Sequence, residues 1–372
     1  MPDTARHHRW MARALQLARK GFYSTHPNPR VGCVIVKNDV ALGEGWHEYT
    51  GGAHAEVNAV QSAEIPAGAD FYVTLEPCSH HGRTPPCVDA LIAARAARVI
   101  VAMQDPNPEV SGRGLEQLRE NGIEVISGVL EAQARQLNRG FIKRMEQQLP
   151  FVSIKMALSL DGRSALANGV SKWISGDAAR RDVQFLRAAA AAILTSAQTV
   201  LVDDPSLNLR LGSEELKQSL APRQPLRVVV DSQLRLSGRE RIFSTAGDIW
   251  IYTCSRNETA KQRLRDSGAQ VIDIAATESG QISLQSMLRD MAARGINDVH
   301  TECGPGLAGA LIEQRLADQL LLYLAPHLLG DQARGGFALG ELTAMDQRKT
   351  CRICDIRQVG EDLRLTLSLE QD

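Results

Sequence analysis

Hydrophobic and polar positions in the first half of the chain alternate between the periodicity of helices and that of strands. Trp10, Ala14 and Leu17 recur at helical spacing, and Gly21 and the prolines that follow it end this helix. The pattern beyond it predicts strands at 31–36, 71–75, 99–103 and 124–127, and helices at 55–63, 88–97 and 115–121. This order predicts a sheet covered by helices.

A second pattern of the same kind starts after residues 139–150, a basic, Gln-rich stretch that ends in a proline. Val152, Ile154 and Met156 alternate with small or polar residues, as in a strand with one apolar face. Further strands are predicted at 226–231, 248–254, 271–274, 298–301, 320–325 and 363–369. Because 372 residues also suit about two domains, we predict two α/β domains, residues 1–147 and 148–372.

The composition is that of a globular protein with balanced charge. Hydrophobic residues make up 44%, and 42 Lys and Arg stand against 43 Asp and Glu, which argues against a surface that coats nucleic acid. The longest notable apolar run, 188–194, is far shorter than the roughly 18 residues of a membrane span. Arg13, Arg19 and Lys20 interrupt the stretch where a secretory signal would lie. We expect a cytoplasmic protein that binds neither nucleic acid nor membranes.

Seven cysteines, an odd number, argue against a disulfide framework and favour metal ligands or buried thiols. Cys33 lies in a predicted buried strand and is expected in the core. Cys351 and Cys354 have the spacing of a metal-binding pair, but no second pair accompanies them. Packing in the core or at the surface is the preferred interpretation for these two, ahead of a second zinc site.

One group of residues has the order and the chemistry of a hydrolytic zinc site. His54 offers an imidazole, and Cys78 and Cys87 offer two thiolates, which leaves the fourth position of a tetrahedral zinc ion open to water. Glu56 is predicted to take a proton from that water and deliver protons to a ring nitrogen and a leaving amine. The alternative is that the cysteines are core residues and that His54 caps a helix. It does not explain four such residues in this order.

The arrangement is close to the H-x-E and P-C-x-x-C signature of zinc deaminases, but eight residues separate the cysteines here instead of two. The intervening loop is polar and contains prolines, so we expect it to contact substrate. Two other functions compete with a small-molecule deaminase. A zinc deaminase of nucleic-acid bases, with a non-reductase accessory domain, would need a basic and aromatic channel at this place. A structural zinc module would have no need of Glu56.

Three segments, His26 to Cys33, His54 to Glu56 and Leu75 to Cys87, resemble the bifunctional deaminase–reductase family of riboflavin biosynthesis. The resemblance implies an N-terminal cytidine-deaminase-like α/β/α domain that binds Zn2+. Its activity would be removal of the 2-amino group of 2,5-diamino-6-(5-phosphoribosylamino)pyrimidin-4-one. Substrate contacts are implied for Asn28, His47, His80 and Arg83. An amide can present a donor and an acceptor to a pyrimidine edge, and a guanidinium suits a phosphate.

The second half contains a Gly-rich loop, Gly304 to Gly309, with a G-x-G-x-x-G string between a predicted strand and an apolar helix. Such a loop lets backbone N–H groups approach a pyrophosphate at a helix N-terminus. The string departs from the Rossmann pattern, because it comes near the end of the chain with no second βαβ half. A doubly wound dinucleotide domain is therefore not expected.

The segments Lys155 to Arg163, Lys172 to Ile174 and Thr199 to Pro205, with the Gly304 loop, resemble the reductase half of the same family. The resemblance implies a dihydrofolate-reductase-like α/β fold. It also implies NADPH-dependent reduction of the ribosyl chain of 5-amino-6-(5-phosphoribosylamino)uracil to a ribityl chain. Catalytic roles are implied for Lys155, Asp203 and Glu302. Substrate contacts are implied for Ser171, Arg187, Leu207, Arg210 and Glu302, with the arginines on the 5-phosphate. NADPH contacts are implied for Ala157, Trp173, Thr199, Asp203, Ser232, Gly304, Pro305, Gly306, Leu307, Ala308, Gly309 and Ala310.

Some of these residues have simpler interpretations that the sequence leaves open. His47 would otherwise be an ordinary surface histidine, Lys155 a solvated strand lysine, and Asp203 the cap of a turn before Pro205. The implied partner is a small phosphorylated pyrimidine. We further expect a homo-oligomer, with a dimer favoured.

Overall fold

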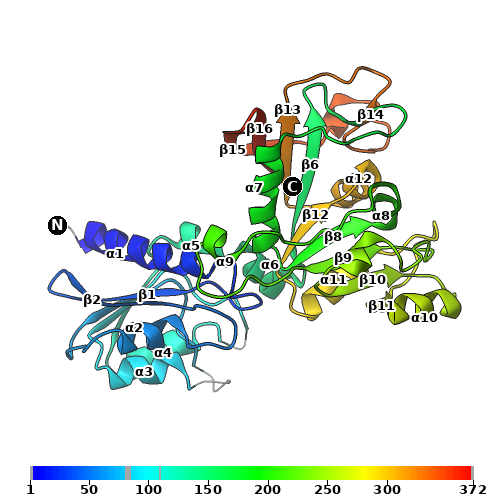
Figure 1. The fold of residues 1–372 in the computed structure, drawn as a ribbon. Helices are drawn as coiled ribbons and strands as arrows, with labels where there is room; N and C mark the ends of the chain where they lie inside the picture. The colour runs from blue at the N-terminus through cyan, green and yellow to red at the C-terminus, as the bar shows by residue number, and fades with distance from the viewer. Residues whose placement is uncertain (1–2, 80–84, 109, 370–372) are drawn as a thin grey trace. The chain divides into compact units, whose positions relative to one another are not determined.

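The computed structural model describes residues 3–79, 85–108 and 110–369. The chain divides into two compact units (Figure 1). One ends at Gln148 and includes Gln218–Leu220, and the other is formed by Leu149–Lys217 and the residues from Ala221 onward. Each unit has its own sheet and its own buried core.

The first unit is built on a five-stranded sheet with the order β2-β1-β3-β4-β5. Strand β1 is antiparallel to β2 and β3, whereas β3, β4 and β5 run parallel. Successive side chains of β1 face opposite sides, so Cys33 and Ile35 join one core and Val34 and Val36 the other. The strands are β1 Gly32–Lys37, β2 Val40–Trp46, β3 Asp70–Val73, β4 Arg98–Val101 and β5 Glu124–Ser127.

Helices cover both faces of this sheet, which confirms the predicted α/β/α layering. Helices α2, α3 and α4 pack over the face with Cys33, and α1, α5 and α6 pack over the other face (Figure 1). The helices are α1 Asp3–Ala18, η1 Arg19–Gly21, α2 Ala55–Gln61, α3 Cys87–Ala93, α4 Arg113–Glu120, α5 Glu131–Leu137 and α6 Arg139–Gln147.

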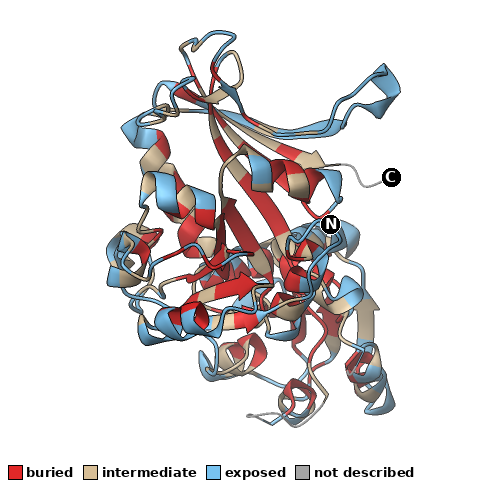
Figure 2. Cartoon of the chain, turned by 90° about the vertical axis from the view of Figure 1, so that its right-hand side faces the viewer, coloured by how far each residue is buried: buried red, intermediate tan, exposed pale blue. Residues whose placement is uncertain are grey.

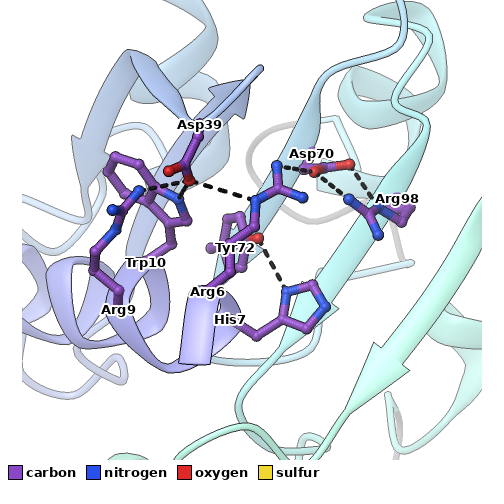
Figure 3. A network of polar contacts seen from close by, with 8 residues as sticks. All are labelled: Arg6, His7, Arg9, Trp10, Asp39, Asp70, Tyr72 and Arg98. Carbon is purple, nitrogen blue, oxygen red and sulfur yellow. Dashed lines mark hydrogen bonds and ion pairs between the residues drawn. The ribbon is translucent and has the colours of Figure 1, made fainter. Parts of the chain in front are cut away.

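Polar contacts fix α1 against the sheet (Figure 3). The buried carboxylate of Asp70 accepts hydrogen bonds from Arg98, at 2.8 and 2.7 Å, and from Arg6 of α1, at 2.9 Å. The ring of His7 lies 3.0 Å from the hydroxyl of Tyr72. Because a buried carboxylate is costly without partners, these pairs hold the N-terminal helix in one position on the sheet.

The second unit contains a nine-stranded sheet with the order β11-β10-β9-β8-β12-β6-β13-β16-β15. The seven strands from β11 to β13 run parallel, and β16 and β15 follow as antiparallel strands at one edge. Figure 2 shows buried central strands in red. The strands are β6 Phe151–Ser159, β8 Ala192–Ser196, β9 Leu226–Val230, β10 Ile249–Thr253, β11 Ala269–Asp273, β12 Asp298–Glu302, β13 Gln319–Ala325, β15 Cys351–Val359 and β16 Asp362–Leu369, with a separate pair, β7 Arg163–Ala165 and β14 Arg334–Gly335.

The parallel arrangement brings the carboxyl ends of β6, β8 and β12 to one edge of the sheet, where sites of α/β proteins usually lie. Helix α8 starts directly after β8, and α12 starts three residues after β12 ends. The helices of this unit are α7 Asp177–Ala189, α8 Ala197–Asp203, α9 Ser213–Leu216, η2 Arg241–Ser244, α10 Glu258–Asp266, α11 Leu284–Ala293, α12 Pro305–Glu313 and η3 Met345–Gln347.

The structure departs from the sequence-based prediction at several elements. Strands β2, β8 and β15 were not predicted, and residues 139–147 form a helix that buries Phe141 and Ile142 where a junction was expected. Strand β8 starts inside an alanine run, which has little β propensity. Among the described helices, none combines the length and hydrophobicity that crossing a membrane requires.

Candidate active sites

Two helix starts and one loop bring the predicted zinc ligands together in the first unit. His54 precedes α2, Cys87 is the first residue of α3, and Cys78 lies beyond β3. Their ligand atoms lie within 4.8 Å of one another, with Nδ1 of His54 3.1 Å from Sγ of Cys87 and 3.5 Å from Sγ of Cys78. One nitrogen and two sulfurs fit zinc, so these residues would hold Zn2+. The side chain of His54 makes no capping hydrogen bond, which removes the alternative role.

The surroundings of the ligands favour a thiolate and place a carboxyl group beside it. The backbone N–H of Cys87 donates to Sγ of Cys78 at 3.3 Å, and the hydrogen bond with the Cys87 thiol lowers the pKa of Cys78. Glu56 is buried in the first turn of α2. Burial and, after it, the negative charge of Cys78 raise the pKa of Glu56 to about 6. A carboxyl group of this kind can exchange a proton near neutral pH.

Asn28 and His47, for which the resemblance implies substrate contacts, lie near the zinc ligand His54. His47 is buried, which excludes an ordinary surface histidine. Its Nδ1 lies 3.0 Å from the carbonyl oxygen of Ala53 and its Nε2 lies 3.1 Å from Nδ2 of Asn28, so Nδ1 donates and Nε2 accepts. The ring is 5.6 Å from that of His54, edge to face. His80 and Arg83 lie outside the described residues.

The sequence analysis did not single out Glu76, which binds the backbone of the segment that packs against Pro77, next to the ligand Cys78. Its buried carboxylate accepts hydrogen bonds from the backbone N–H groups of Asp105 at 3.1 Å and of Gly112 and Gly114 at 2.9 Å. A Cβ atom on Gly114 would lie 2.1 Å from the carbonyl oxygen of Pro77, so the two segments are in direct contact. The signal in the sequence that could have identified Glu76 is its position two residues before a ligand cysteine.

In the second unit, a cleft of about 550 Å³ opens at the carboxyl ends of the parallel strands. The residues that line it include every one predicted to be catalytic or to contact the substrate of the reductase. Lys155 comes from β6, Glu302 from β12 and Asp203 from the end of α8. The others are Ser171, Arg187, Leu207 and Arg210, together with Ala157 and Trp173, which were predicted to contact the cofactor.

A buried ion pair organises the floor of this cleft. Nε of Arg187 donates to Glu302 Oε1 at 2.6 Å and Nη2 donates to Oε2 at 2.9 Å, while Nη1 donates to the carbonyl oxygen of Asn208. Burial raises the pKa of Glu302, but the charge of Arg187, together with the hydrogen-bonding interactions of His300 and Arg187, outweighs it and lowers the pKa well below its usual range. Burial lowers the pKa of Lys155, although Glu302 partly opposes the shift.

A second cleft, of about 680 Å³, adjoins the first through Gln198, Thr199, Gly304 and Pro305, which line both. Ser232, Gly306, Leu307 and Ala310 line it as well, whereas Ala308 and Gly309 line neither cleft. A Cβ atom on Gly309 would lie 2.0 Å from the carbonyl oxygen of Ala338, so this glycine permits close packing. A Cβ atom on Gly306 would meet nothing within 4 Å, so the N-terminus of α12 offers an open cradle that fits the pyrophosphate of NADPH.

The remaining cysteines form no further metal site among the described residues. Cys33 is fully buried in the core, as predicted, and burial raises the pKa of its thiol well above the usual value. Cys351 and Cys354 are exposed on β15. The group of His54, Cys78 and Cys87 is the one set of three or more potential ligands found in the described part of the chain.

Comparisons with known proteins identify a family match for each unit of the chain. Residues 4–103 match the cytidine and deoxycytidylate deaminase zinc-binding region, and residues 150–365 match the RibD C-terminal domain. The chain is 47% identical to the riboflavin biosynthesis protein RibD of Escherichia coli, over 96% of this chain and 98% of that protein. The RibD of Haemophilus influenzae is 45% identical, over 96% of each.

Solved structures give the same result. RibD of Acinetobacter baumannii superimposes with a TM-score of 0.90 at 40% identity, covering 99% of this chain and all of that one. A Thermotoga maritima protein, described as a diaminohydroxyphosphoribosylaminopyrimidine deaminase and 5-amino-6-(5-phosphoribosylamino)uracil reductase, gives 0.87 at 33% identity, covering 99% of each. The match of the second unit to a reductase domain disfavours a nucleic-acid deaminase with an unrelated accessory domain, and it disfavours a structural zinc module.

Proposed function

The chain belongs to the RibD family of bifunctional deaminase–reductases of riboflavin biosynthesis, with zinc and NADPH as cofactors, and we propose which of its residues carry each step. The deaminase domain is residues 1–147 and the reductase domain residues 148–372; the division of the compact units at Gln148 supports this boundary. The substrate is a pyrimidinone with a phosphoribosylamino arm, of the kind named for the Thermotoga relative.

The observation that carries the deaminase assignment is the buried carboxylate of Glu56 beside three ligand atoms that lie within 4.8 Å of one another. His54, Cys78 and Cys87 would hold zinc, which would supply the electrophile that acidifies water. Glu56 then holds the proton taken from the attacking water and transfers it to the ring nitrogen, and a second proton leaves with ammonia. Asn28 presents its amide to the pyrimidine edge, and His47 fixes the orientation of that amide through their hydrogen bond.

In the reductase domain, NADPH held by the residues of the two clefts would supply a hydride to C1 of the ring-opened sugar. Lys155 faces this position from β6, where an ammonium of lowered pKa can place a proton or positive charge near the reacting carbon. Glu302 binds the sugar hydroxyls, and Asp203 lies between substrate and cofactor. Residues Ala157, Trp173, Thr199, Ser232, Gly304–Leu307 and Ala310 contact the cofactor.

The contacts of the two arginines predicted to bind the 5-phosphate support different roles for them. Three of the five N–H donors of Arg187 are used by Glu302 and Asn208, so its first role is to orient Glu302. Arg210 is exposed and lines the same cleft, so it offers its guanidinium to the phosphate, with Ser171 and Leu207 beside the sugar.

One experiment tests the order of the two steps. Zinc-loaded protein is given the diaminopyrimidinone phosphate, and NADPH is added afterwards. Ammonia release is expected before NADPH is added, and cofactor oxidation only after it. Absence of ammonia before NADPH is added, or oxidation of NADPH without any release of ammonia, would refute the assignment.

Two further properties complete the proposal. A cytoplasmic location follows from the need for reduced thiols at the zinc site. A homodimer is supported by β15, an edge strand of the nine-stranded sheet on which Ile353 and Ile356 are 58% and 57% exposed. Sedimentation or light scattering of the purified protein measures this state directly.

A further inference from the structure

The second cleft of the reductase domain has an unusual distribution of charge. Of the described residues that line it, Arg235 alone is charged, and the polar remainder are hydroxyl and amide side chains. A site that selects NADH typically offers a carboxylate to the ribose 2′-hydroxyl, whereas a site for NADPH offers an arginine to the 2′-phosphate. The lining of this cleft, with one arginine and no carboxylate, is therefore typical of a site for NADPH.

The backbone around Arg235 is held in one conformation. The buried carboxylate of Asp231 accepts hydrogen bonds from the N–H groups of Arg235 and Leu236, both at 3.0 Å. Leu234 and Leu236 are buried in the core on either side, so the side chain between them is directed outward. An arginine on a fixed turn loses less conformational freedom on binding an anion than one on a mobile loop.

The guanidinium of Arg235 is oriented but not neutralised. Its Nη1 donates to Oε1 of Gln198 at 3.0 Å, and Gln198 lines both clefts. Within the described part of the chain this amide is its one hydrogen-bond partner, so four of its five N–H donors remain for an anion. Thr277 and Ser279 line the same cleft, with their hydroxyl oxygens 2.9 Å apart, and add neutral donors.

We propose that Arg235 binds the 2′-phosphate of NADPH and gives the reductase its preference for NADPH over NADH. The inference rests on the cofactor placement proposed above, with the pyrophosphate at Gly304–Leu307. A phosphomonoester carries close to two negative charges and forms charge-assisted hydrogen bonds with a guanidinium. NADH lacks this group and gains nothing from Arg235.

Equilibrium binding of NADPH and NADH to the full chain tests the proposal without turnover. Arg235→Ala is expected to weaken NADPH binding about 10- to 100-fold and to change NADH binding less than twofold. Arg235→Lys should retain part of the preference, because it keeps the charge. Adenosine 2′,5′-bisphosphate should compete with NADPH more strongly than 5′-AMP on the unaltered protein, and this difference should disappear in Arg235→Ala. The matched control is Arg239→Ala, an exposed arginine of the same segment that lines neither cleft.

A second variant tests the placement of the cofactor separately from the role of Arg235. Gly306→Val places a side chain in the open cradle and should weaken NADPH and NADH alike. If Gly306→Val changes neither cofactor, the cofactor placement is wrong and the assignment of Arg235 falls with it. If Gly306→Val weakens both but Arg235→Ala weakens neither, or weakens both equally, the placement stands and the role of Arg235 is refuted.

Discussion

Lys155, in the middle of β6, and Glu302, the last residue of β12, are register partners on adjacent parallel strands. Both side chains line the cleft of the reductase domain, and each is tolerated there for a different reason. The carboxylate of Glu302 is compensated by Arg187, whereas Nζ of Lys155 lies 5.6 Å from the centre of the Tyr323 ring. The sheet thus sets a stable anion beside an amine whose basicity burial has reduced.

Replacing the carboxylate of Glu302 by a neutral group should lower both the stability and the activity of the reductase domain. Glu302→Gln leaves the buried guanidinium of Arg187 without a counter-ion, so we expect a loss of about 3 kcal/mol in the unfolding free energy of the reductase domain and loss of NADPH oxidation. Denaturant unfolding measures the first and cofactor absorbance the second. Glu215→Gln breaks the exposed pair with Arg181 and should cost less than about 1 kcal/mol.

The same ion pair predicts a dependence of stability on pH. Because Arg187 keeps the pKa of Glu302 below its unfolded value, the stabilisation is fully present above the unfolded pKa of about 4.3. It is lost as the pH falls through the lower pKa of the folded state. The difference in unfolding free energy between the unaltered protein and Glu302→Gln should be smaller at pH 3 than at pH 5. A difference that persists unchanged in acid would contradict the assignment.

Glu56→Gln should separate the two activities of the chain. The amide cannot carry the proton from water to the substrate, so ammonia release should fall at least about 10²-fold. Zinc content should not change, because none of the three ligands is altered, and NADPH oxidation on the deaminated substrate should continue. Glu64→Gln, an exposed glutamate just beyond α2, is the control. Retained deamination in Glu56→Gln would remove this residue from the proton transfer.

The sequence predicted most of the parallel strands because their apolar runs are continuous and bounded by turns. It did not predict β2, where Gly43 and Gly45 interrupt the apolar alternation. The reason for these glycines is tertiary: a Cβ atom on Gly45 would lie 2.4 Å from the carbonyl oxygen of Ala55 in α2. Close approach of a helix to a strand leaves no periodic signal in the sequence.

The zinc ligands were predictable because a metal needs particular donor types, and these stand in a recognisable order. The role of Glu76 was not predictable from the sequence, because its partners are backbone N–H groups of residues 105–114, which carry no side-chain signature. The pairing of Arg187 with Glu302 was likewise hidden, because the two residues are 115 positions apart in the chain. Residue types reveal chemistry, whereas partners across the fold require the structure.

Glu76→Gln should weaken zinc binding although Glu76 is not a ligand. An amide has one acceptor oxygen in place of two, so the N–H groups of Gly112 or Gly114 lose their partner and the Pro77–Cys78 segment loses its support. We expect a 10- to 100-fold loss in zinc affinity, measured by competition with a chromophoric chelator. Glu116→Gln, exposed on α4, is the control. Unchanged zinc affinity together with lowered stability would show that Glu76 supports the fold alone.

Lys155→Met should abolish reduction and at the same time stabilise the reductase domain. Burial lowers the pKa of Lys155 below its unfolded value. The protonated amine therefore lowers the unfolding free energy at every pH below the folded pKa. Methionine has similar length and no charge, so the variant should unfold at higher denaturant concentration at pH 7. This gain should decrease as the pH rises toward about 10.4, the pKa of lysine in the unfolded chain.

Activity measurements complete this prediction. NADPH oxidation by Lys155→Met should fall at least about 10²-fold while ammonia release continues, because the zinc site lies in the other domain. Lys172→Met is the control for stability, since Lys172 is exposed and its Nζ donates to the carbonyl oxygen of Asp203. If Lys155→Met destabilised the domain at pH 7, the amine would be making a contact whose value exceeds the cost of its burial. In that case the attraction of Glu302 for Lys155, and not burial, would dominate the electrostatics of the cleft.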